Sequence, residues 1–234
     1  LTAFSRVVQY QSFVVLSMIL AMLFAWRFMN AAEAGPARRY LFLAVSCFAF
    51  SALSHFEGLL LFPAFFFAII YRCSRTGVKK CLPDSAGSLL LFLVLIGFFY
   101  APLLATSYGP HALVDHWQGR QDGNLHFHVD LFFSAIPFCT STPYILCLIV
   151  FAPFALFSRK RLPVALSLCW FFSFFLFFML ISSKPRTHVY TFFPAFTLLA
   201  SAGFIVLYDK LSSLIPNQFS RRRLFPAAAA IFMA

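Results

Sequence analysis

Long apolar runs separated by short basic segments constrain this chain more than any other feature. A membrane-spanning helix needs about 20 mostly apolar residues, and it pairs its backbone polar groups within one segment. Because 62% of the 234 residues are hydrophobic and only 11% are charged, a soluble fold of this length would expose too much apolar surface. The runs lie approximately at 11–28, 40–54, 58–71, 87–105, 131–157, 162–181 and 190–208, and another begins near 224.

These runs predict an all-α fold, a polytopic helical bundle in a membrane with about seven complete spans and a truncated eighth. We expect residues 1–234 to form a single transmembrane domain. The apolar pattern is already under way at Leu1 and is still running at Ala234, so we interpret the chain as a fragment of a longer protein. The net charge of +11 then indicates cytoplasmic loops rather than a nucleic-acid partner.

The segment from Tyr40 to Tyr71 is too long for one ordinary span and short for two. Basic residues flank it on both sides, at Arg38, Arg39, Arg72, Arg75, Lys79 and Lys80. If both flanks are cytoplasmic, as the positive-inside rule predicts, the chain crosses twice and turns at residues 54–58 on the other side. The same rule places every histidine on that outer side, namely His55, His111, His116, His126, His128 and His188.

The turn at residues 182–189 carries a basic cluster between two apolar runs. Lys184, Arg186 and His188 lie here, Tyr190 follows at the start of the next run, and Pro185 stiffens the turn. Charge-assisted hydrogen bonds from such groups bind phosphate strongly, so the cluster indicates an enzyme that handles a lipid-linked phosphate. The alternative is that these cations snorkel at the membrane interface, although a cluster on the outer side runs against the positive-inside rule.

The predicted turn at residues 54–58 is a second candidate site. Glu57 is placed to accept a hydrogen bond from an acceptor hydroxyl or to orient His55. The alternative is a polar turn that caps two helices.

Three further residues on the outer side are candidates. Trp117 and Arg120, in the loop at 106–130, are assigned to the substrate side, whereas a solvated loop explains the rest of that segment. Arg6 precedes the first span and either contacts the phosphate or snorkels. The spacing of the loop's histidines and aspartates matches no familiar metal site, so we predict no metal.

Three segments in this order resemble the GT-C glycosyltransferases of the dolichyl-phosphate-mannose protein mannosyltransferase type, which include the bacterial aminoarabinose lipid A transferases. The segments are residues 4–11, 52–64 and 184–196. The resemblance implies transfer of a sugar, such as mannose or another hexose or pentose, from a polyprenyl- or dolichyl-phosphate donor to a protein, lipid or glycan acceptor, with inversion. It assigns the donor phosphate to Lys184, Arg186, His188 and Tyr190.

The resemblance also implies what this chain lacks. The family's catalytic base is an acidic residue in an outer loop that would precede Leu1, which leaves Glu57 as the fallback base within the chain. Several relatives carry Lys where this chain has His55. No nucleotide-binding motif occurs, so no cofactor beyond the lipid-linked donor is expected. The implied location is the endoplasmic reticulum membrane in a eukaryote or the plasma or inner membrane in a bacterium.

Two other functions remain open at this stage. One is a transporter or flippase for an anionic lipid or solute, which should place polar residues at mid-membrane depth. The other is a subunit with the same fold and no activity of its own. The ionisable residues gather at one predicted face, and this favours the enzyme.

Overall fold

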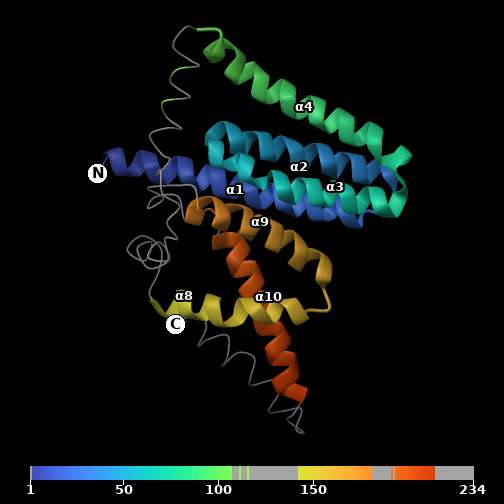
Figure 1. Ribbon diagram of the computed structural model, residues 1–234, viewed down its shortest axis with the longest axis vertical. Coiled ribbons are helices and arrows are strands. Elements are labelled where there is room, and N and C mark those ends of the chain that lie inside the picture. The colour runs from blue at the N-terminus through green and yellow to red at the C-terminus, as the bar shows by residue number, and fades with distance from the viewer. Residues whose placement is uncertain are drawn as a thin grey trace. The chain divides into compact units, whose positions relative to one another are not determined.

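The computed structural model describes residues 2–106, 111, 115, 142–180, 191 and 193–213, and every regular element among them is a helix (Figure 1). The all-α prediction is therefore confirmed. The elements in chain order are α1 (Thr2–Asn30), α2 (Ala34–Ser54), the 3-10 helix η1 (Phe56–Leu61), α3 (Phe62–Thr76), α4 (Val78–Leu104), α8 (Thr142–Phe151), the 3-10 helix η2 (Ala152–Phe157), α9 (Arg161–Leu180) and α10 (Phe193–Ser213).

Among the described residues, four helical segments are long and apolar enough to cross a membrane. They are Ser12–Asn30, Phe56–Thr76, Val78–Pro102 and Phe193–Ser213. Two shorter apolar helices, Ile145–Phe157 and Arg161–Phe177, occupy the runs predicted at 131–157 and 162–181. This composition is that of a membrane protein. The predicted count of about seven spans is not confirmed, and the eighth run near 224 lies outside the described residues.

The chain divides into two compact units, and each is described by itself. The first contains residues 1–128 and 172–185, and the second contains 129–171 and 186–234. In the first unit α1 packs along α2, and both α2 and α3 contact α4. Small side chains on α2 allow the close approach of its neighbours, and those that are buried are Ala37, Ala44, Ala49, Ser51 and Ala52.

Aromatic rings hold α2, α3 and α4 together in the first unit. The Phe48 ring stacks on Phe65 with centroids 4.7 Å apart and on Phe92 at 4.8 Å. Each is an offset pair of the kind that adds about 0.5–1.5 kcal/mol beyond burial alone. Phe48 therefore fixes the lateral packing of the helices on both sides of the turn at His55.

The predicted reversal at residues 54–58 is confirmed, but the helices beside it are longer than predicted, since α2 and the segment Phe56–Thr76 each have 21 residues. Helix α2 ends at Ser54, His55 is extended, and η1 leads into α3 with Pro63 in the first turn. The Arg72 guanidinium donates a hydrogen bond to the carbonyl oxygen of Ala31, which lies in the loop between α1 and α2. The end of α3 therefore returns to the start of α2, and the two basic flanks of residues 40–71 lie at the same end of this helical hairpin.

The second unit is built around α10, which crosses α8 and packs on η2 (Figure 1). Its small core contains Ala155, Val164 and Leu199. Gly203 is the point of closest approach, because a Cβ atom there would lie 2.9 Å from the Phe151 carbonyl carbon and 3.0 Å from the Ala155 nitrogen. The helix backbones touch directly at this glycine, as small residues allow in membrane helix pairs.

Candidate functional site

The turn between α2 and η1 is fixed by three backbone features. His55 has φ −161° and ψ 139°, an extended conformation that ends α2 and begins η1. Its N–H donates to the Ser51 carbonyl oxygen at 3.0 Å, and its own carbonyl oxygen accepts from the Gly58 N–H at 2.9 Å. The backbone polar groups at this helix end are therefore paired within the turn, as a low-dielectric setting requires.

Gly58 allows the turn to pack against α2. A Cβ atom at this position would lie 2.7 Å from the Ala52 Cα and would also meet the backbone of Ser51. Only a residue without a side chain fits here. The result is that η1 lies on the last turns of α2, and the neighbouring Glu57 is carried into the interior of the first unit.

The Glu57 carboxylate and the His55 imidazole lie next to each other at this turn. The Glu57 Oε1 atom lies 3.4 Å from the His55 Nδ1 atom. The Glu57 side chain is 0% exposed, whereas the His55 side chain is 14% exposed. The His55 ring also lies against the Phe56 ring, with centroids 4.3 Å apart. The carboxylate is therefore enclosed, and the imidazole is the member of the pair that reaches the surface.

The His55 Nδ1 atom has two possible partners at the same distance. It accepts a hydrogen bond from the Glu57 backbone N–H at 3.4 Å when it carries no proton. When it carries a proton, it donates to the Glu57 carboxylate, also at 3.4 Å. In the second arrangement the Nε2 atom of a neutral ring is the nitrogen that carries the lone pair and can act as the base. The site thus has the carboxylate–imidazole order found where a carboxylate orients a general base.

Most of the other residues predicted for the site lie outside the described residues. This applies to the proposed phosphate ligands Lys184, Arg186, His188 and Tyr190 and to the loop residues Trp117 and Arg120. Arg6 lies within α1, but its side chain is outside the described part. Of the predicted set, the structure brings together His55 and Glu57.

The other end of the hairpin carries the cations. Arg72 is only 8% exposed, and its guanidinium lies 5.9 Å from the centroid of the Phe28 ring in addition to bonding Ala31. Beside it is a cavity of about 340 Å³ lined by residues that include Arg75, Lys80 and Asp84. Sequence reasoning assigned these cations to a loop by charge alone and missed the structural contacts of Arg72. These contacts could have been expected from the position of Arg72, because an arginine one turn inside the end of a helix can bury its stem against neighbouring residues.

Among the described residues, no group of three or more His, Cys, Asp or Glu side chains is placed to hold a metal ion. The prediction that no metal is required remains a prediction. Comparisons of the chain with protein-family models, with curated proteins and with solved structures find no match.

Proposed function

We propose that this chain is part of a membrane glycosyltransferase that moves a sugar from a polyprenyl-phosphate donor to an acceptor hydroxyl. Its sequence resemblance to the GT-C glycosyltransferases supports the reaction class. The apolar helices support a site at a membrane. The observation that carries the proposal is the enclosed carboxylate of Glu57 beside the surface-reaching imidazole of His55.

The difference in burial between Glu57 and His55 assigns them different roles in the proposed reaction. Because Glu57 is fully buried, an acceptor hydroxyl meets His55 first. His55 takes the proton of the acceptor hydroxyl, the acceptor oxygen bonds to the anomeric carbon of the sugar, and the bond from that carbon to the donor phosphate oxygen breaks. Glu57 is a positioning residue that holds the imidazole and stabilises its charge after proton transfer. This assignment replaces Glu57 itself as the base within the chain.

The donor phosphate is assigned to Lys184, Arg186, His188 and Tyr190. As the sugar leaves, negative charge grows on the phosphate, and nearby cations lower the free energy of that transition state. The proposal gives these residues the leaving-group side and His55 the acceptor side.

The test is sugar transfer by the full-length protein in membranes, with a radiolabelled polyprenyl-phosphate sugar as donor. His55→Asn should lower kcat about 10²- to 10⁴-fold, the usual contribution of general acid–base catalysis. Glu57→Gln should also lower kcat, because the imidazole loses the carboxylate that positions it. Glu33→Gln is the matched control, since Glu33 is exposed before α2 and should have no effect.

A second arm of the same assay tests the phosphate assignment. Arg186→Ala should weaken use of the donor about tenfold or more, because a hydrogen bond to a charged group contributes about 1.5–3 kcal/mol. Arg186→Lys should restore only part of this, since the bidentate geometry is lost. Full transfer by His55→Asn together with total loss on removal of an acidic residue upstream of Leu1 would overturn the role of His55.

A transporter is the rival function, and the described part of the chain does not favour it. The two buried charged residues there, Glu57 and Arg72, lie at opposite ends of the α2–α3 hairpin rather than at its middle. Transport of a fluorescent anionic lipid by reconstituted protein, with no sugar transfer, would overturn the enzyme proposal.

A further inference from the structure

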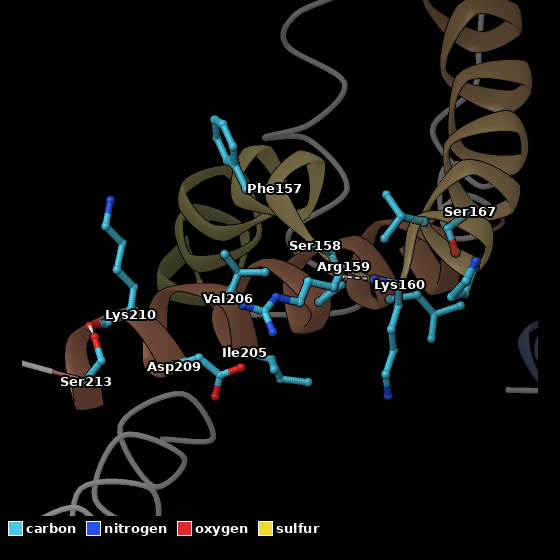
Figure 2. A pocket seen from close by; sticks show the side chains of 14 residues that line it. Phe157, Ser158, Arg159, Lys160, Ser167, Ile205, Val206, Asp209, Lys210 and Ser213 are labelled. Carbon is cyan, nitrogen blue, oxygen red and sulfur yellow. Dashed lines mark hydrogen bonds between the residues drawn. The ribbon is translucent and has the colours of Figure 1, made fainter.

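The second unit contains a larger cavity that the proposed reaction does not use. It has a volume of about 690 Å³ and is lined by the segment that joins η2 to α9, the first turns of α9 and one side of α10 (Figure 2). Cavities of about 300–1,000 Å³ are the size that holds small-molecule ligands. All of its lining residues belong to the second unit, so its shape does not depend on how the two units are placed.

One part of the cavity lining is positively charged. Arg159 and Lys160 precede α9, and Lys210 lies in the last turns of α10 beside Asp209 (Figure 2). All four residues are exposed. Within the described residues, no ion pair joins Asp209 to any of the three cations. The lining therefore carries three cations against one carboxylate, which complements an anion.

Two of the serine hydroxyls in the cavity lining are already engaged in hydrogen bonds. The Ser158 hydroxyl accepts a hydrogen bond from the Lys160 backbone N–H at 3.2 Å, and the Ser213 hydroxyl donates to the Lys210 carbonyl oxygen at 2.6 Å. These bonds hold the backbone on either side of the cavity. The long cationic side chains are then the groups that can move to contact a ligand. An anion bound here would be held mainly by charge and by charge-assisted hydrogen bonds.

The rest of the lining is apolar. Val164, Leu198, Ala202 and Ile205 contribute to it, and Leu198 and Ile205 are 53% and 52% exposed. These residues belong to α9 and to α10, and α10 is long and apolar enough to span a membrane. A soluble phosphate would use only the cations of this cavity. A molecule with an anionic head and an apolar tail would use both parts.

We propose that this cavity binds an anionic glycerophospholipid of the surrounding leaflet. Its phosphate contacts Arg159, Lys160 and Lys210, and the first part of its acyl chains lies along α10. The basic segment at 159–161 is one that the positive-inside rule places on the cytoplasmic side, where anionic lipids concentrate. Basic pockets between membrane helices on that side are typical sites for such headgroups. The inference does not depend on the glycosyltransferase proposal.

The test is photocrosslinking to the full-length protein in lipid nanodiscs. Phosphatidylglycerol with a photoreactive acyl chain should label peptides from residues 157–171 and 193–213, and phosphatidylcholine with the same chain should label them far less. Arg159→Gln/Lys160→Gln should reduce the phosphatidylglycerol signal about thirtyfold, from about 1 kcal/mol for each cation near the surface. Arg38→Gln/Arg39→Gln is the matched control, because it removes two exposed cations from α2 and should leave the signal unchanged.

A second variant tests the cavity itself. Val206→Trp occupies space in the cavity without changing charge, and it should reduce labelling of the same peptides by phosphatidylglycerol. Gel filtration and circular dichroism show whether each variant is folded, and the Val206 variant keeps the test valid if the double variant is not. Equal labelling by the two lipids, or full labelling in a folded Arg159→Gln/Lys160→Gln variant, would overturn the proposal.

Discussion

The two ends of the α2–α3 hairpin use charge in opposite ways. At the His55 end, a carboxylate is fully buried beside one imidazole, and the backbone of η1 lies directly on α2. At the other end, Arg75, Lys79 and Lys80 are exposed, and Arg72 is the cation that is buried. Exposed cations contribute little to stability and suit a charged membrane surface. A buried carboxylate costs free energy, and this makes the His55 end the better candidate for chemistry.

The largest expected effect on stability tests the close packing at the His55 end. Gly58→Ala should destabilise the protein by about 3 kcal/mol, the upper part of the range for overpacking, because the new methyl group meets the backbone of α2. Gly97→Ala is the matched control, since a Cβ atom there has nothing within 4 Å. Thermal unfolding in detergent measures both. If the two variants are equally stable, the turn at Gly58 is no more tightly packed than the open helix face at Gly97.

The next largest expected effect on stability is at the basic end of the α2–α3 hairpin. Arg72→Ala should destabilise the protein by about 1.5–3 kcal/mol, because a hydrogen bond from a charged group to the Ala31 carbonyl oxygen is lost. Arg75→Ala should stay within about 0.5 kcal/mol of the parent, as exposed substitutions usually do. The same unfolding assay applies. If the two variants behave alike, Arg72 belongs with the exposed cations and has no structural role.

A smaller difference in stability is expected between substitutions of two buried serines, Ser51 and Ser88. Ser51 is 0% exposed, and its hydroxyl has no hydrogen-bond partner among the described residues. Ser88 is 1% exposed, and its hydroxyl donates to the Ser85 carbonyl oxygen at 2.8 Å. Ser51→Ala should therefore be neutral or stabilising by up to about 1 kcal/mol, whereas Ser88→Ala should cost about 1 kcal/mol. A clear loss of stability in Ser51→Ala would mean that this hydroxyl has a partner at the His55 end.

Sequence reasoning predicted the helical class and the reversal at His55 because both follow from local signals. Apolar run length marks the helices, and cations on both flanks of residues 40–71 require the chain to turn back. Helix bounds extend beyond the predicted runs, as in α1 and α4, because helices continue past the apolar stretch into polar flanks. Among the described residues, four helical segments are long and apolar enough to cross a membrane, whereas the apolar runs of the sequence predicted about seven spans.

The site was less predictable than the fold. His55 and Glu57 were predicted as candidates because they lie in a short polar turn. The sequence did not indicate which of the two is more buried, and burial decides which one meets a substrate. The cavity beside Arg159 and Lys210 was not predicted at all. It joins residues about 50 positions apart that share no local pattern, so it depends on how α10 crosses the segment before α9.

The most direct test of this comparison is whether the two ends of the hairpin lie on opposite sides of a membrane. Ser54 and Lys79 are exposed at the two ends and suit single cysteines in a background without native cysteine. An impermeant maleimide applied to sealed vesicles should label Ser54→Cys and Lys79→Cys from opposite sides. Labelling of both positions from the same side would contradict the account, because the turn with His55 and Glu57 would then share a face with the basic end.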